Sequence, residues 1–160
     1  MLKRAKLNIK SSKHPKMRKL VDDLRDKKDK IMHHKGIIKL EKIRIYDKLK
    51  ESGIAKEHPT EFIKGSEFIK QILIYKQNNA LRYSTGKLAA YVFKKFPELN
   101  TPEVVKSILI ATGNPKLGIN DINKLVSDMF DPKVSESTRK GVIFSLIRSI
   151  NKKNYGYLID

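Results

Sequence analysis

Apolar residues recur along most of the chain at spacings of three and four residues, which places them on one face of an α-helix. Pro15 is a favourable first helical residue because its missing N–H group is not needed there. The stripe that follows consists of Met17, Leu20, Val21, Leu24 and Ile31. Gly36 is the expected end of this helix. Residues 37–50 fit either a strand or a helix, and their length and Lys/Glu content favour a helix that ends near Gly53.

The rest of the chain repeats this helical pattern in shorter segments. A loop with the sequence GIAKEHP precedes a helix over 60–78 that Thr60 can cap. Further helices are predicted over 85–96, 101–112, 120–130 and 135–150, with caps at Ser84 or Thr85, Thr101, Asn120–Asp121 and Ser135 or Ser137. The positions expected to face inward are Phe62, Ile69, Ile72, Leu73, Lys76, Leu88, Tyr91, Val92, Phe96, Val105, Ile108, Leu109, Ile122, Leu125, Val126, Met129, Val142, Ile143, Leu146, Ile147 and Ile150.

These helices are individually too short to be stable alone and therefore must pack together. The sequence thus predicts an all-α fold, a compact bundle of about six or seven short helices with a basic, extended N-terminal arm. Residues 1–14 show no sustained period and form the basic flexible arm in this prediction. Residues 15–160 form a single helical-bundle domain.

Charge adds a functional expectation to this fold. The chain has 160 residues with 35 Lys or Arg and 17 Asp or Glu, a formal net charge of +18. Two-thirds of the excess lies within residues 1–50. Most of the basic residues are lysines, which suit phosphate contacts better than bidentate reading of bases. The charge favours nucleic acid as the partner over an acidic protein or an anionic membrane surface.

The candidate nucleic-acid-binding residues combine cations with neighbouring aromatic rings, because cations hold phosphates while rings stack on exposed bases. Tyr83 and Tyr155 fall in predicted loops outside the apolar stripes and are the candidate stacking residues, whereas Tyr91 and Phe96 are assigned to the core. The full set is Lys3, Arg4, Lys6, Lys10, Lys13, Lys16, Arg18, Lys19, Lys27, Lys28, Lys35, Arg82, Tyr83, Lys87, Lys94, Lys95, Lys152, Lys153 and Tyr155.

Catalytic chemistry is not expected from this sequence. There is no cysteine, and none of the four histidines forms a metal-ligand pattern with another histidine or a glutamate. Asp22, Asp26 and Asp29 are stacked on one helix and could hold the divalent metal of a nuclease. Basic residues within one turn make intrahelical ion pairing the favoured alternative. We therefore predict no enzyme, no catalytic residue, no cofactor and no metal.

The function predicted from these features is that of a non-catalytic subunit or accessory protein. It would contact the phosphate backbone of RNA or single-stranded DNA, together with other protein subunits of a larger nucleoprotein complex in the cytoplasm. In size, charge and helix content alone the chain resembles ribonucleoprotein subunits and the small helical subunits of CRISPR effector complexes. No apolar run approaches the ~18 residues of a membrane span. The alternatives are a duplex-DNA regulator that uses residues 85–96 and 101–112 as a helix-turn-helix, and a viral genome-associated structural protein.

Overall fold

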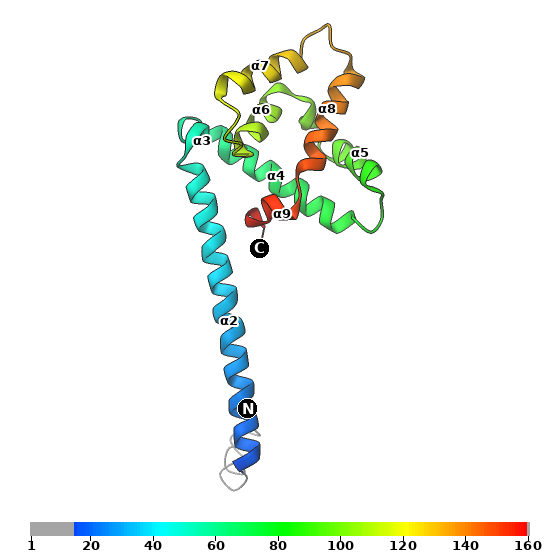
Figure 1. Ribbon diagram of the computed structural model, residues 1–160. Coiled ribbons are helices and arrows are strands. Elements are labelled where there is room, and N and C mark those ends of the chain that lie inside the picture. Colours follow the sequence, from blue (N-terminus) through cyan, green and yellow to red (C-terminus); the bar gives the residue numbers. More distant parts are fainter. Residues whose placement is uncertain (1–14, 160) are drawn as a thin grey trace. The chain divides into compact units, whose positions relative to one another are not determined.

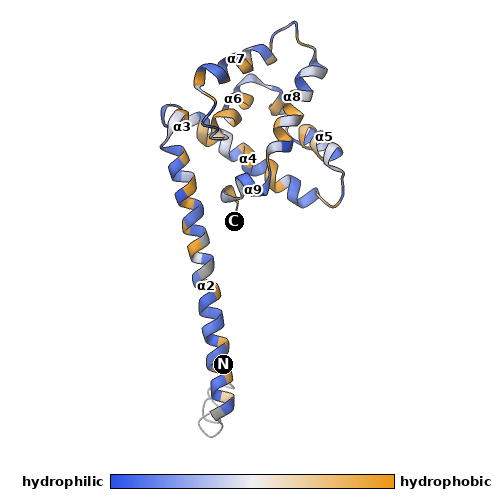
Figure 2. Ribbon diagram, viewed as in Figure 1, coloured by the Kyte–Doolittle hydropathy of each residue, from blue (hydrophilic) through white to orange (hydrophobic). Residues whose placement is uncertain are grey.

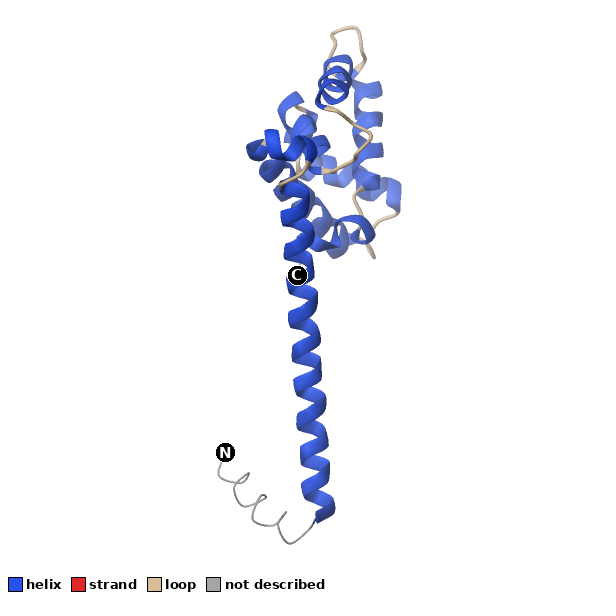
Figure 3. Ribbon diagram, turned by 60° about the vertical axis from the view of Figure 1, so that its left-hand side comes forward, coloured by secondary structure: helices blue, strands red, loops and turns tan. Residues whose placement is uncertain are grey.

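All regular structure that the computed structural model describes, in residues 15–159, is helical (Figures 1 and 3). This confirms the all-α prediction. None of the described helices combines the length and the apolar character needed to cross a membrane. The helices are α2 (Pro15–Lys50), α3 (Gly53–Glu57), α4 (Pro59–Asn79), α5 (Thr85–Lys95), the 3-10 helix η1 (Pro97–Asn100), α6 (Pro102–Ala111), α7 (Ile119–Met129), α8 (Glu136–Ser149), α9 (Lys152–Tyr155) and the 3-10 helix η2 (Gly156–Leu158).

The chain divides into two compact units, unit 1 over residues 1–41 and unit 2 over residues 42–160. The described part of unit 1 is one stretch of helix, residues 15–41 of α2. The predicted basic arm, residues 1–14, lies outside the described residues. The last nine residues of α2 belong to unit 2, where Tyr46 and Leu49 pack against the hydrophobic core.

Helix α2 corrects two sequence predictions. It runs for 36 residues without a break at Gly36, so the predicted helix end there is wrong. A glycine inside a helix costs only about 1 kcal/mol relative to alanine, which is too little to end a helix whose flanks both favour it. The apolar stripe predicted to pack into a bundle is exposed instead, and Leu24 leaves 60% of its surface accessible.

The core of unit 2 is centred on the contact between α4 and α6, and Figure 2 shows α6 as a mainly hydrophobic helix. Phe62, Ile69 and Ile108 are fully buried there. The backbones of the two helices approach closely at Gly65. An added Cβ at this glycine would lie 1.9 Å from the carbonyl oxygen of Ser107. Gly65 is therefore required by the packing of α4 against α6.

Helices α5, α6 and α8 begin after the predicted caps Ser84, Thr101 and Ser135. Helix α7 begins at Ile119 after Gly118, so the cap predicted at Asn120–Asp121 is wrong. The Ser135 side chain accepts a hydrogen bond from the Thr138 N–H at 3.2 Å, as expected of a cap for α8. Helix α4 begins at Pro59, not at Thr60, and the predicted loop before it contains the short helix α3. Gly53 adopts a φ of +54°, a left-handed conformation that suits the sharp turn between α2 and α3.

The inward positions are mostly correct, with three exceptions in unit 2. Tyr91, Leu125 and Val142 are exposed, although each lies in a predicted inward stripe. Each is at the edge of its stripe, where a helix in a small bundle meets solvent instead of a neighbour. The remaining aromatic of the α5 stripe, Phe96, packs against the core and contacts the rings of Phe68 and Tyr75 edge-on.

Candidate nucleic-acid interface

The predicted binding residues fall into four groups in the structure. Five lie in residues 1–14, outside the described range. Six lie on α2 and are exposed, and three lie on α9. The group that the structure brings together consists of Arg82, Tyr83, Lys87, Lys94 and Lys95, on and beside α5.

Tyr91 lies among these residues, although it is not one of the predicted binding residues. Its ring stacks on that of Tyr83, with centroids 4.3 Å apart and planes inclined by 28°. The guanidinium of Arg82 lies 5.7 Å from the Tyr83 centroid, and the Lys94 ammonium lies 5.4 Å from the Tyr91 centroid. Each of the two stacked rings therefore has one cation beside it.

The helical spacing of α5 extends the cluster along one exposed face. Lys87, Tyr91 and Lys94 follow one another at i, i+4 and i+7, so they share a face of the helix. Leu88 and Val92 on the other side are buried and fix the orientation of that face. Phosphates spaced along a single strand can thus meet two lysines that lie about 10 Å apart along the axis, given 1.5 Å per residue.

Helix α8 contributes one further cation. Arg148 lies against the first turn of α5, where its guanidinium nitrogen is 3.7 Å from the position of a Cβ added to Gly86. We call the combined surface the α5 patch, which consists of Arg82, Tyr83, Lys87, Tyr91, Lys94, Lys95 and Arg148.

The stretch of sequence around α5 carries no negatively charged side chain. Residues 68–97 contain no Asp or Glu. Leu81, next to Arg82, is fully exposed in the turn that leads to α5. An exposed leucine beside stacked tyrosines and cations makes this turn a surface that can contact both bases and phosphates.

The strengths of the contacts indicate how a base would bind. A cation–π contact at an exposed site contributes about 0.5–1 kcal/mol. Stacking of a base on an aromatic side chain contributes about 1–3 kcal/mol. A base can therefore replace Lys94 on the exposed face of Tyr91, after which the ammonium is free to bind a phosphate.

Tyr155 was predicted to stack on bases, and the structure shows that this prediction is wrong. It is only 9% exposed and belongs to the core, so its ring has no face available for a base. Burial raises its pKa, and burial together with the neighbouring Tyr155 and Tyr46 raises the pKa of Tyr157 to about 12. Both tyrosines are thus packing residues. Lys152 and Lys153 in the same short helix are exposed, but the aromatic partner predicted for them is not.

Two other lysines have structural roles. The Lys76 ammonium donates hydrogen bonds to the carbonyl oxygens of Ile147 and Ile150, at 3.0 and 2.6 Å. It thereby satisfies carbonyls at the end of α8, and burial lowers its pKa. The Lys42 ammonium donates to the Ile159 carbonyl oxygen at 2.7 Å. These contacts tie α4 and the end of α2 to the C-terminal segment of unit 2.

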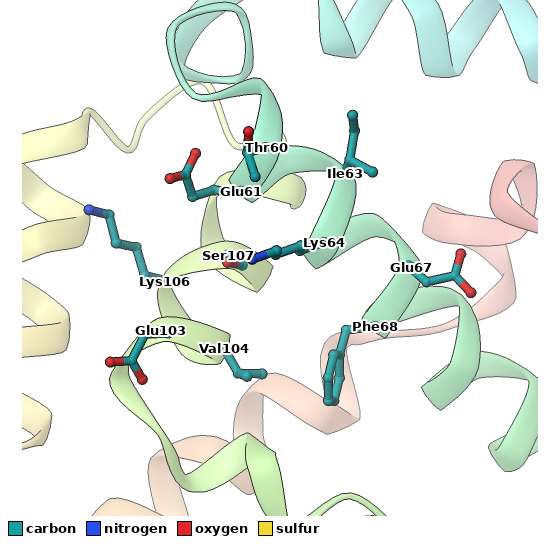
Figure 4. A pocket seen from close by; sticks show the side chains of 10 residues that line it. All are labelled: Thr60, Glu61, Ile63, Lys64, Glu67, Phe68, Glu103, Val104, Lys106 and Ser107. Atoms are coloured by element: carbon teal, nitrogen blue, oxygen red, sulfur yellow. The ribbon is translucent and has the colours of Figure 1, made fainter.

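A groove of about 680 Å³ lies between α4 and α6, apart from the α5 patch (Figure 4). Its carboxylates, Glu61, Glu67 and Glu103, outnumber its two ammonium groups, Lys64 and Lys106. In Figure 4, Glu61 and Glu103 project to the same side as Lys106, whereas Glu67 lies at the opposite end. A groove with this charge does not suit a phosphate backbone.

Two alternatives from the sequence are not favoured by the geometry. Helix α6 was the proposed recognition helix, but nearly all of its residues from Val105 to Ala111 are buried, so it cannot enter a major groove. In the part of the chain that the structure describes, no three Asp, Glu or His side chains converge on a possible metal position. This includes the stacked aspartates of α2.

The sequence did not identify Tyr91 and Arg148 as site residues. Tyr91 was assigned to the core because it fits the spacing of Leu88 and Val92. The absence of acidic residues from 68–97 was the available signal for this surface. Comparison of the chain with models of protein families, with curated proteins and with solved structures finds no match.

Proposed function

We propose that the protein is a non-catalytic subunit or accessory protein that binds single-stranded nucleic acid, RNA or DNA, through the α5 patch. The observation that supports this most directly is the stacked pair Tyr83–Tyr91 flanked by Arg82 and Lys94. Rings for bases and cations for phosphates are the two components of sequence-tolerant single-strand binding. We propose a cytoplasmic location and a role beside other protein subunits.

The excess of lysine over arginine supports backbone binding without sequence readout. The chain has 35 basic residues, of which only seven are arginines. Lysine is a point charge that binds phosphate without the fixed geometry of a bidentate contact. Binding is then expected to depend steeply on salt, because each neutralised phosphate releases counterions.

The test is a fluorescence-polarisation titration of the full chain at several salt concentrations. The probes are single-stranded RNA, single-stranded DNA and duplex DNA of unrelated sequences. We expect tighter binding to single strands than to the duplex, with little dependence on sequence. A strong preference for one duplex sequence, or binding that is independent of salt, would contradict the proposal.

Two variants locate the binding at the α5 patch. Tyr91→Leu keeps an apolar side chain but removes the stacking ring, and we expect a loss of roughly ten-fold in affinity for single strands. Lys87→Gln with Lys94→Gln removes two phosphate contacts and is expected to reduce the salt slope by about 0.7 per lysine. The matched control is Lys124→Gln with Lys133→Gln, two exposed lysines elsewhere in unit 2. Equal losses in patch and control variants would show that net charge alone binds the strand.

A further inference from the structure

Helix α8 packs beside α5, on the side from which Arg148 reaches the α5 patch (Figure 1). Two contacts show how the helices are aligned. Arg148, near the end of α8, lies by Gly86 at the start of α5. The ring of Phe144, earlier in α8, is 5.7 Å from the ring of Phe93 near the end of α5. The two helices are therefore antiparallel.

Cations and rings alternate along the side of α8 that faces α5. Lys140, Phe144 and Arg148 are four residues apart, so they form one row on the helix. The Lys140 ammonium lies 5.3 Å from the centroid of Phe93. Phe93 and Phe144 meet edge to face, and each is only partly buried. The row thus has a cation at each end, about 12 Å apart along the axis at 1.5 Å per residue, with two rings between them.

This row adjoins the lysines of the α5 patch. On α5, Gly86, Ala90 and Phe93 recur at intervals of four and three residues and form the row next to α8. Lys87 and Lys94 each come one residue after a member of that row, which places them about 100° further around the helix. The surface is therefore continuous from the patch, across the lysines of α5, to Lys140 on α8.

Helix α8 carries no carboxylate after its first residue, because residues 137–159 contain no Asp or Glu. That first residue, Glu136, pairs with Lys140 at 3.4 Å, and both side chains are exposed. An exposed pair four residues apart on a helix contributes only about 0.3–0.5 kcal/mol, so a phosphate can replace Glu136 on Lys140. The neighbouring Arg139 is engaged otherwise, since it donates a hydrogen bond to the Asn100 side-chain oxygen at 3.0 Å. Lys140 and Arg148 are thus the cations of α8 that a strand on the α5 side can meet.

We propose that a single strand bound at the α5 patch continues onto α8. The added surface, the α8 extension, consists of Phe93, Lys140 and Phe144, and Arg148 joins it to the patch. Phosphates of the strand contact Arg148 and Lys140, and the two rings form an apolar floor for the bases between them. The ligand is then a strand of several nucleotides that crosses two helices, and not a mononucleotide. This inference rests on the proposed function, because the strand must also occupy the α5 patch.

An acidic peptide is the other polyanion that a basic surface attracts. The rings favour nucleic acid over such a peptide. Lys94 lies over Tyr91 and Lys140 lies over Phe93, so the same pairing of a cation with a ring occurs in the patch and in the extension. Carboxylates would use only the cations, whereas a strand supplies phosphates for the cations and bases for the rings.

The test compares the binding of the full chain to oligouridylates of about four and about twelve nucleotides, lengths within the range of single-strand site sizes. The short probe can occupy the α5 patch alone, and the long probe can also reach α8. We expect Lys140→Gln to weaken binding of the long probe about three-fold and to lower its salt slope by about 0.7. Binding of the short probe should stay within about two-fold of the parent, because an exposed charge outside its contacts contributes little. Tyr91→Leu, by contrast, should weaken both probes.

Gly141 allows a change of charge that does not disturb packing. It is exposed, it follows Lys140, and a Cβ added there has no atom within 4 Å. Gly141→Glu places a carboxylate beside the extension and should weaken binding of the long probe about three-fold through repulsion of its phosphates. Gly141→Gln adds a side chain of the same size without charge and should bind as the parent does. Lys133→Gln lowers the net charge by the same one unit elsewhere in unit 2, and it is the control for net charge.

Three results would overturn the α8 extension while leaving the α5 patch in place. Lys140→Gln and Gly141→Glu could bind the long probe as the parent does although Tyr91→Leu still weakens both probes. Lys133→Gln could weaken the long probe as much as Gly141→Glu does. Poly-glutamate with the same number of charges could bind as tightly as the long probe and lose affinity in Lys140→Gln, which would assign α8 to an acidic protein. If Tyr91→Leu leaves both probes unaffected, the proposed function itself fails, and the extension fails with it.

Discussion

Leu24 of α2 and Phe62 of α4 are both large apolar residues on helices with a clear apolar stripe, yet Leu24 is 60% exposed and Phe62 is 0% exposed. The stripe of α4 packs against α6, whereas the described part of unit 1 offers no second element to its stripe. The comparison teaches that an apolar stripe predicts a helix and a contact, but not whether the contact lies within the chain.

Truncation of the two residues should give the largest difference between the units. Phe62→Ala removes a fully buried ring and leaves a cavity, so we expect the free energy of unfolding of unit 2 to fall by about 3–5 kcal/mol. Leu24→Ala removes an exposed side chain and should change it by less than about 0.5 kcal/mol. Urea denaturation followed by circular dichroism measures both. A comparable loss in Leu24→Ala would show that the α2 stripe is buried in the isolated protein.

Gly65 in α4 and Gly36 in α2 are both inside helices, but only Gly65 lies against a neighbouring helix. In Gly65→Ala, the added methyl group would overlap the Ser107 carbonyl and contact Ala111. Because backbone atoms cannot move aside without separating α4 from α6, we expect destabilisation of about 1–3 kcal/mol, or more if the helices separate. Thermal unfolding of the variant measures this loss. A variant as stable as the parent would contradict the close contact of these helices.

The fold was predictable where local periodicity and packing agree. The stripes of α4 and α6 identified Phe62, Ile69 and Ile108 as core residues because these positions are central on their helix faces. Tyr91 was misassigned because stripe spacing alone does not separate the middle of a buried face from its edge. Tyr155 was misassigned because α9 is four residues long, and such a helix depends on tertiary contacts and on the Asn151 cap, whose side chain accepts from the Asn154 N–H.

The α5 patch was predictable only where its residues are neighbours in the sequence. Arg82, Lys94 and Lys95 could be proposed from their neighbouring aromatic residues in the sequence. The partner of Tyr83 was not apparent, because stacking on Tyr91 requires the turn before α5 to fold back on the helix. Arg148 is more than fifty residues away in the sequence and reaches the patch only through the packing of α8 on α5. Contacts of this kind carry no local sequence signal.

The smallest expected effect comes from Gly36, the counterpart of Gly65 in α2. A Cβ added at Gly36 has no atom within 4 Å, so alanine fits without strain. Alanine favours a helix over glycine by roughly 1 kcal/mol, partly by restricting the unfolded chain. We expect Gly36→Ala to raise the helical signal of the full chain. The melting temperature of unit 2 should stay within about 1 °C of the parent, because a local change in α2 leaves the core of α4 and α6 untouched. Circular dichroism at 222 nm and calorimetry measure the two quantities. A fall in helicity would show that Gly36 serves a bend or a close contact in α2.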